Sequence, residues 1–101
     1  MGFNIFQSEK NNQYYFNLKA GNGEIILQSE GYENQSGAEN GVQSVITHAQ
    51  DEANFERRVA KDGQDYFVLK ASNGLIIGKS EMYKSKAGME NDIPSVMNNA
   101  H

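Results

Sequence analysis

The sequence predicts an α+β fold: two tandem β-β-β-α repeats with pseudo-twofold symmetry, forming one antiparallel sheet with both helices packed on one face. Three observations support this prediction: an internal repeat, Asn-Gly and Asp-Gly pairs between stretches of alternating hydrophobicity, and two stretches of helical spacing. A chain of 101 residues has the usual length of one domain. We therefore expect a single domain, residues 1–101, built of repeats at about 1–50 and 51–101.

The repeat is seen when the chain is aligned with itself at an offset of 51 positions. Residues 15–50 then match residues 66–101 without a gap, and 18 of the 36 pairs are identical. Such similarity indicates an internal duplication. Each copy of about 50 residues would be marginal alone. We therefore expect the two copies to share one core, like the subunits of a dimer joined into one chain.

Each repeat contains an Asn-Gly pair, Asn22-Gly23 and Asn73-Gly74. Asn-Gly favours a two-residue hairpin turn in which both residues have positive φ. A shift of one residue would move every side chain to the other sheet face, so the hydrophobic pattern selects this register. In the first repeat it pairs Ala20 with Ile25, Leu18 with Leu27 and Phe16 with Ser29.

This register places apolar residues on one face, which we expect beneath the helices. The predicted core face carries Phe16, Leu18, Ile25 and Leu27 with their partners Phe67, Leu69 and Ile76. We call the opposite face the open sheet face. It carries Tyr15, Asn17, Lys19, Ile26, Gln28 and Glu30 in the first repeat, and Tyr66, Val68, Lys70, Ile77, Lys79 and Glu81 in the second. Phe6 is a further candidate for this face.

A second hairpin precedes the first in each repeat, with turns at Asn11-Asn12 and Asp62-Gly63. In the first repeat, folding at this turn brings Phe3 and Ile5 onto the core face. In the second repeat the same register places Glu56 and Arg58 there and turns Phe55 away. We expect a bulge that restores Phe55 to the core, the alternative being a different environment for this strand.

A helix follows the hairpins in each repeat. The apolar residues with helical spacing are Ala38, Val42, Val45, Ile46 and Ala49, and Met89, Ile93, Val96, Met97 and Ala100. Ser85 is the expected N-cap of the second helix, and Asn34 or Ser36 that of the first. Pro94 falls within the second helix on its solvent side, where it should produce a kink.

The frame LKAxNGxII…SExY occurs twice, from Leu18 to Tyr32 and from Leu69 to Tyr83. Together with the order of elements, it resembles the YegP-like family of short bacterial tandem-repeat proteins over nearly the whole chain. The resemblance implies two β-β-β-α units in one sheet, with exchange of a strand between the halves: the strand after the first helix crosses to the other half. It brings no established activity, cofactor or catalytic residue. The chain departs from the family pattern at Asn11-Asn12, Asn34 and Pro94.

Composition limits the classes of function. The chain has no Cys and hence no thiol nucleophile or thiolate metal site. It shows no signal peptide and no apolar run of the roughly 18 residues that a membrane span needs, so we expect a cytoplasmic protein. Because the two copies already satisfy each other's interface, we also expect a monomer. The net charge of −4 weighs against a nucleic-acid binder.

The residues Ser29, Glu30 and Tyr32, with their copies in the second repeat, resemble a catalytic set. A nucleophilic serine needs a base within hydrogen-bond reach, and no His stands beside it. We favour a structural role for Ser29 and cross-strand pairing for Glu30. The two histidines, His48 and His101, lack a partner at ligand spacing, so we expect no metal or cofactor.

We expect a non-catalytic binding module that uses the open sheet face to bind an unknown protein or a small ligand. The candidate binding residues are Tyr15, Lys19, Ile26, Tyr66, Lys70, Ile77 and Lys79. One alternative is a small enzyme with a site between the repeats, formed by Glu30, Glu81, Tyr32 or Tyr83. The other is a weak nucleic-acid binder that uses Lys19, Lys70, Lys79 and the Arg57-Arg58 pair.

Overall fold

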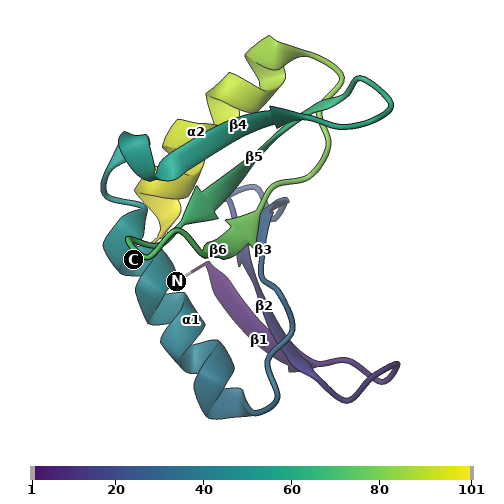
Figure 1. The fold of residues 1–101 in the computed structure, drawn as a ribbon, viewed down its shortest axis with the longest axis vertical. Coiled ribbons are helices and arrows are strands. Elements are labelled where there is room, and N and C mark those ends of the chain that lie inside the picture. The colour runs from purple at the N-terminus through teal and green to yellow at the C-terminus, as the bar shows by residue number, and fades with distance from the viewer. Residues whose placement is uncertain (1, 101) are drawn as a thin grey trace.

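The computed structural model describes residues 2–100, and its elements follow the predicted order (Figure 1). The first half contains β1 (Phe3–Gln7), β2 (Tyr14–Lys19), β3 (Ile25–Gln28) and α1 (Gln35–His48). The second half contains the short 3₁₀ helix η1 (Glu52–Asn54), β4 (Phe55–Val59), β5 (Asp65–Lys70), β6 (Ile76–Lys79) and α2 (Lys86–Asn99). The predicted α+β class, with one six-stranded antiparallel sheet and two helices, is confirmed.

The sheet has the strand order β1-β2-β3-β6-β5-β4. The halves meet where β3 and β6 pair through Gln28 and Lys79. The expected exchange of a strand between the halves is wrong, because β4 pairs with β5 of its own half and β1 with β2. No exchange is needed, because α1 packs across both halves. It contacts β5 and β6 as well as β1 and β2, so the chain that follows α1 already begins beside the second half.

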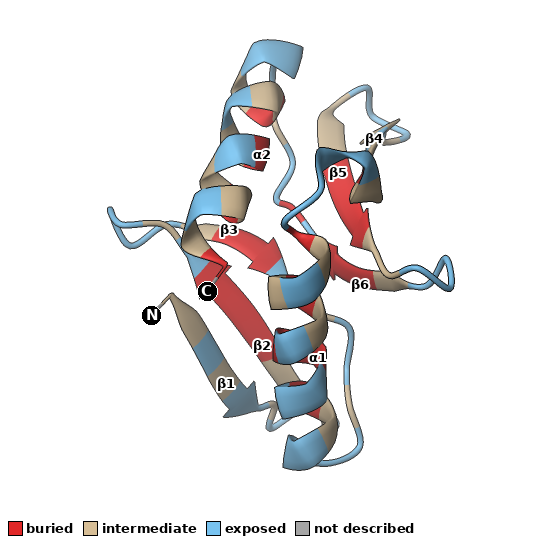
Figure 2. Cartoon of the chain, turned by 90° about the vertical axis from the view of Figure 1, so that its left-hand side faces the viewer, coloured by how far each residue is buried: buried red, intermediate tan, exposed pale blue. Residues whose placement is uncertain are grey.

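Both helices cover the same face of the sheet, as Figure 2 shows, with the buried parts of β2, β3, β5 and β6 behind them. One hydrophobic cluster lies between these layers and contains residues of both halves. Its fully buried members include Phe16, Leu18, Leu27, Phe67 and Leu69. Large buried side chains of this kind each contribute roughly 1.5–3 kcal/mol, so the sheet and the helices depend on contacts from both halves.

The helix caps are as predicted. Asn34 Oδ1 accepts a hydrogen bond from Gly37 N at 2.7 Å, and Ser85 Oγ accepts one from Gly88 N at 3.1 Å. Each cap satisfies an N–H group that has no partner within the helix. Pro94 is exposed on α2, as expected for a residue that is tolerated only on the solvent side. The kink at Pro94 stays a prediction.

The predicted two-residue turns are wrong, because each of these loops has three residues. In the first half, Gly23 N donates to Ala20 O at 2.9 Å and Ala20 N donates to Glu24 O at 2.8 Å. Positive φ is confined to the glycine, with 87° at Gly23, and Asn22 lies outside that region. This is a type I turn followed by a left-handed glycine. It is favoured here because Asn22 Oδ1 accepts from Glu24 N at 3.0 Å.

The longer turn changes which isoleucine faces the helices. Lys19 pairs with Ile25, so the predicted Ala20–Ile25 pair is wrong, and a bulge at Ile26 then restores the predicted Leu18–Leu27 pair. Ile26 is only 3% exposed and belongs to the core, whereas Ile25 is half-buried and lies on the same face as Lys19. The second half repeats this arrangement. Ile26 and Ile77 are therefore corrected from the open sheet face to the core, and Ile25 and Ile76 from the core to the open sheet face.

In the hairpins β4–β5 and β1–β2, the predicted core positions of Phe55, Phe3 and Ile5 are confirmed, and the predicted two-residue loops are wrong. A three-residue loop that ends at Gly63 places Phe55 opposite Leu69 in the core, so the expected return of Phe55 is confirmed, with Gly63 as the bulge. Glu56 and Arg58 consequently lie on the open sheet face. In the first half the loop has four residues, 9–12, instead of the two expected. Phe3 pairs with Leu18 and Ile5 with Phe16, so both still lie on the core face, as predicted.

Candidate functional site

One row of side chains crosses the open sheet face, one from each strand. In strand order it consists of Asn4, Asn17, Gln28, Lys79, Val68 and Glu56. The members from the first half are all uncharged amides. The members from the second half are a cation, an aliphatic residue and an anion. The two halves of this face are therefore built alike in backbone and differ in chemistry.

The charges of the second half satisfy one another. Glu56 accepts hydrogen bonds from Lys70 Nζ at 2.8 Å and from Arg58 Nε. Hydrogen bonds from Lys70 and then from Arg58 hold the pKa of Glu56 below its ordinary value. Lys79 Nζ lies 5.1 Å from the centroid of the Tyr66 ring, within the range of a cation–π contact. The predicted binding residues Tyr66, Lys70 and Lys79 are thus on the expected face and engaged with neighbours.

The first half presents an aromatic pair on the same face. Phe6 and Tyr15 stack with ring centroids 6.0 Å apart and an angle of 20° between their planes. Asn11 Nδ2 donates to Tyr15 Oη at 2.9 Å, which fixes the outer end of this ring. Phe6 is 42% exposed, and every other aromatic residue within residues 2–100 is buried or half-buried. Lys19 lies at the end of β2 and is exposed.

A cavity of about 150 Å³ lies beside this stack. It is lined by Phe6, Tyr15, Ile25, Asn17 and Gln28, together with Phe16 and Ser29. None of these side chains carries a charge. Asn17 is only 8% exposed, and no protein donor within the described chain lies in hydrogen-bond range of its Oδ1. Buried polar atoms nearly always have a partner, so this oxygen is the exceptional feature of the face.

The sequence predictions missed most of this cavity. Ile25 was missed because the turn was expected to be one residue shorter. Asn17 was placed on the open sheet face and left out of the binding set. The signal that could have found it is the difference between the repeats, since Val68 stands at the equivalent position. Because the fold accepts an apolar residue at this position, the polar side chain of Asn17 suggests a role in binding.

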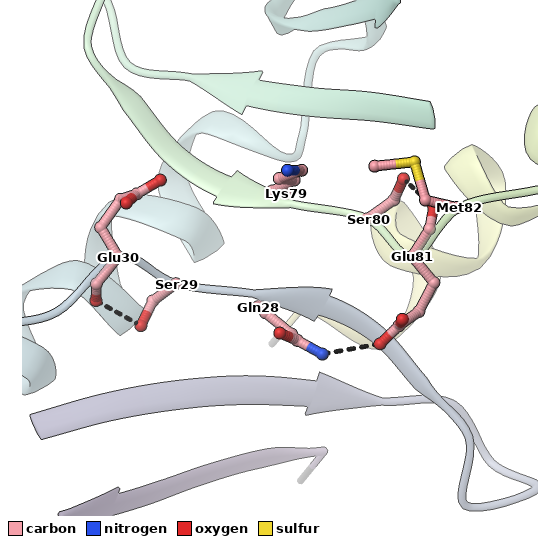
Figure 3. Close-up of a pocket in the computed structure, with 7 residues that line it drawn as sticks. All are labelled: Gln28, Ser29, Glu30, Lys79, Ser80, Glu81 and Met82. Carbon is pink, nitrogen blue, oxygen red and sulfur yellow. Dashed lines mark hydrogen bonds between the residues drawn. The ribbon is translucent and has the colours of Figure 1, made fainter. Parts of the chain in front are cut away.

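A second, polar pocket of about 350 Å³ lies where β3 and β6 end. Figure 3 shows its lining, with Glu30 and Glu81 at opposite ends and Gln28 Nε2 donating to Glu81 Oε1 at 2.6 Å. Ser29 Oγ accepts from Phe16 N at 2.9 Å and donates to Glu30 O at 2.8 Å. The hydroxyl is thus used in holding the strand edge, as we expected.

The tyrosines of the alternative catalytic set lie away from that pocket. Tyr32 stacks on Phe16 with centroids 6.2 Å apart, and Tyr83 Oη donates to Asp92 Oδ2 at 2.6 Å. Burial raises the pKa of both phenols, with the Glu30 charge adding for Tyr32 and the Asp92 bond for Tyr83. Both phenols therefore stay protonated at neutral pH. The structure brings the two carboxylates to one pocket and does not bring the tyrosines there.

The cations of the nucleic-acid alternative do not form one patch. Arg57 pairs with Phe67 across the strands, so its side chain leaves the sheet on the helix side, where it bonds Glu90 and Glu52 at 2.7 Å each. Arg58 lies on the other face and bonds Glu56. A phosphate would have to compete with these carboxylates. The neighbouring arginines are thus divided between two faces and two ion-pair groups.

His48 has a structural position at the end of α1. Its Nδ1 lies 2.8 Å from Ser44 O and therefore donates, while Nε2 accepts from Ser72 N at 3.2 Å in the second half. His101 lies outside the described residues. Within residues 2–100, no group of three or more His, Asp or Glu is placed to hold a metal ion. Neither α1 nor α2 is long and apolar enough to cross a lipid bilayer.

The fold and this face define a small α+β protein with an open antiparallel sheet. The chain belongs to the family described as "Domain of unknown function (DUF1508)", whose model matches residues 9–56 and again residues 60–101. The resemblance to the YegP-like proteins is confirmed. UPF0339 protein YegP of Yersinia pestis is 46% identical over 98% of this chain and 88% of that protein.

Other relatives show similar identity over most of their length. UPF0339 protein MS1092 of Mannheimia succiniciproducens is 49% identical over 99% of this chain and 88% of its own. The solution NMR structure of UPF0339 protein SO3888 from Shewanella oneidensis has a TM-score of 0.90 at 49% identity, covering 99% of this chain and 86% of that one. The NMR structure of yegP from E. coli, titled a protein of unknown function, has a TM-score of 0.90 at 44% identity and covers 97% and 84%. These names assign no activity, and the function of the family is unknown.

Proposed function

We propose that this protein is a non-catalytic binding module that holds an uncharged group on the open sheet face of its first half. The observation that carries the proposal is the cavity beside the Phe6–Tyr15 stack. Binding sites for small molecules are concave, mainly apolar and aromatic, and contain a few polar groups that orient the ligand. This cavity has that composition, with Asn17 and Gln28 as the polar groups.

The charge distribution supports the same half of the face. In the second half, Glu56 is bonded by Lys70 and Arg58, and Lys79 covers Tyr66. A ligand there would have to replace contacts that already exist. In the first half, the Phe6–Tyr15 stack and the amides form no ion pair, although Gln28 Nε2 already donates to Glu81 Oε1 and Tyr15 Oη accepts from Asn11. The binding role of Tyr15 is retained in this proposal, while Lys19, Lys70 and Lys79 become secondary.

We also propose that residues 1–101 form a single domain made of two copies of one unit. Three observations support this: the identical pairs at an offset of 51, the two matches of the family model, and a strand order that reads the same from either edge. Because each copy would already cover the other's central strand, the protein should be a monomer. A cytoplasmic location stays a prediction from the sequence.

The binding proposal is tested by titrating the ¹⁵N-labelled full chain with a library of small neutral and charged fragments and following two-dimensional NMR spectra. We expect fragments to shift the signals of Phe6, Tyr15 and Gln28. Tyr15→Ala should abolish these shifts, and the matched variant Tyr66→Ala should leave them. Shifts confined to the helix side or to the second half would contradict the proposal, as would turnover of any fragment.

A further inference from the structure

The outer edge of β1 carries backbone groups that the fold leaves without partners. β1 is the last strand on its side of the sheet (Figure 2). Lys19 N of β2 donates to Gly2 O at 2.9 Å. Because bonded residues alternate along an antiparallel strand, the even-numbered residues of β1 are the ones that bond β2. The N–H and C=O groups of Phe3, Ile5 and Gln7 therefore point away from the sheet, and no other segment within residues 2–100 bonds them.

The opposite edge of the sheet, formed by β4, is protected. Phe55 N donates to Glu52 O of η1, so its outward N–H is already used. The next three residues, Glu56, Arg57 and Arg58, are all charged and all form ion pairs. Charged side chains on an edge strand are a common means of preventing another chain from pairing there. β1 has the sequence FNIFQ, without a charged residue or a proline, so it lacks this protection.

Phe6 lies beside this free edge, on the open sheet face. Its own N–H and C=O groups face β2, so a residue opposite Phe6 on an added strand would belong to a non-hydrogen-bonded pair, where side chains approach most closely. Aromatic and β-branched residues form favourable cross-strand pairs with an aromatic residue. At the equivalent position of β4 stands Arg58, which bonds Glu56. The exposed ring thus favours an apolar neighbour at the unprotected edge alone.

The length of the edge indicates which occupant fits it. β1 has only five residues, whereas stable complexes of folded proteins bury about 1,200–2,000 Å². A second folded copy is therefore a poorer occupant than an extended segment, which can use a strand edge by itself. An antiparallel segment fits better than a parallel one, since antiparallel pairing is slightly more stable per residue.

We propose that the free edge of β1 pairs with an extended, uncharged peptide segment of a partner protein, which places an aromatic or β-branched side chain opposite Phe6. The inference rests on the proposed binding function and identifies the bound uncharged group as that side chain. Backbone bonds to the outward groups of Ile5 and Gln7 supply the affinity, and the contact with Phe6 supplies the selectivity.

The probe is the blocked peptide acetyl-Ser-Thr-Phe-Thr-Ser-amide, titrated into the ¹⁵N-labelled full chain. In the proposed register its Phe lies opposite Phe6, and its two Thr residues lie opposite Ile5 and Gln7. We expect binding at about the millimolar level, with the largest shifts at the backbone amides of Ile5 and Gln7. Largest shifts at Arg57 and Val59 of β4, or on the helix side, would overturn the proposal.

Two methylated forms of the peptide test the backbone pairing on the unaltered protein. Methylation of both Thr nitrogens removes the N–H groups that face β1 and should weaken binding about 10-fold or more. Methylation of the Phe nitrogen, whose N–H points away from β1, is the matched control and should leave binding close to that of the parent peptide. Equal affinities of the two methylated peptides would overturn the proposal.

Gln7→Pro removes one outward N–H and no bond of the sheet, so proline is compatible with this edge position. We expect a spectrum that remains dispersed and peptide binding that is weakened about 2- to 10-fold. Val59→Pro, at the equivalent position of β4, should leave binding unchanged. An equal loss in both variants would overturn the proposal. Should Gln7→Pro not fold, the methylated peptides decide.

The remaining outcomes separate this inference from the proposed function. If the peptide does not bind while small fragments still shift the open sheet face of the first half, this inference fails and the proposed function stands. If neither the peptide nor any fragment shifts that face, both fail. Shifts of Ile5 and Gln7 that grow with protein concentration in the absence of peptide, together with a dimer in sedimentation, would assign the edge to a second copy and overturn the proposal.

Discussion

Leu27 occupies the space that a side chain at Gly78 would fill, since a Cβ on Gly78 would lie 2.6 Å from Leu27 Cδ2. The two residues are equivalent under the offset of 51 and are in contact where β3 meets β6. Both are buried. Two leucines would not fit there, so the halves differ at this contact between β3 and β6.

The first prediction uses this contact. Leu27→Ala should cost about 2–5 kcal/mol of unfolding free energy through the cavity that it leaves, and Gly78→Ala about 1–3 kcal/mol through overpacking. In the double variant the new methyl group enters the space vacated by Leu27. We therefore expect the double variant to lose less stability than the two single losses combined, by about 0.5–3 kcal/mol in urea unfolding.

The control is a second double-mutant cycle that uses Gly21 in place of Gly78. An added Cβ at Gly21 would meet nothing within 4 Å. Leu27→Ala and Gly21→Ala should be additive within about 0.5 kcal/mol. Additivity in the Leu27–Gly78 pair as well would show that the two side chains do not share one space.

The second prediction concerns the three-residue turns. Gly23 has a φ of 87° and open space around its Cβ position, so a substitution there meets conformational strain alone. Gly23→Ala should destabilise the protein by about 1–2 kcal/mol. Gly21→Ala, two residues earlier and outside the left-handed region, should be neutral or stabilising by up to about 1 kcal/mol. Equal effects of the two substitutions in thermal unfolding would refute the assigned turn.

The third prediction concerns alkaline pH. Burial, and then the hydrogen bond to Asp92, raise the pKa of Tyr83 above its ordinary value of about 10. A group whose pKa is raised by folding contributes stability below the unfolded pKa and loses it as pH rises above that value. The free energy of unfolding should therefore fall above about pH 10. Tyr83→Phe should show a smaller fall, and an unchanged slope would contradict this role.

The fourth prediction concerns acid. Arg57 donates to both Glu90 oxygens, at 2.7 and 3.0 Å, and these bonds lower the pKa of Glu90. A lowered folded pKa contributes stability above the unfolded value of about 4.3 and loses it as pH falls. Because the pair is partly exposed, the effect should not exceed about 1 kcal/mol. Glu90→Gln should reduce the loss between about pH 5 and 3, measured by urea unfolding. Glu39→Gln, at the equivalent position of α1, is the matched control, and an equal reduction there would contradict the assignment.

Much of the fold was predictable because the repeat doubles every signal. Helical spacing and the caps Asn34 and Ser85 located both helices, and alternation assigned Phe16 and Leu18 to the core. The turn type was not predictable from Asn-Gly alone. The same dipeptide suits a two-residue turn and a three-residue turn, and the choice depends on a local bond from the Asn side chain.

That single residue of loop length explains the errors at the site. Ile25 and Ile26 are adjacent and chemically identical, so the sequence offers no means of telling which one faces the helices. The bulge decides it, because the side chain of Leu27 must remain opposite Leu18. The lack of a hydrogen-bond partner for the buried Asn17 Oδ1 likewise depends on the packing of several strands, which no sequence pattern determines.

The most direct test of the shared core is the behaviour of residues 1–50 expressed alone. In the intact chain α1 packs on β5 and β6 of the second half, and α2 packs on β2 and β3 of the first. The isolated half therefore loses much of its burial, while backbone ordering still costs about 1–2 kcal/mol per residue. Circular dichroism and sedimentation should show a chain that is unfolded or self-associated, and the full protein should unfold in one transition as a monomer. A stable, folded monomer of residues 1–50 would contradict the shared core.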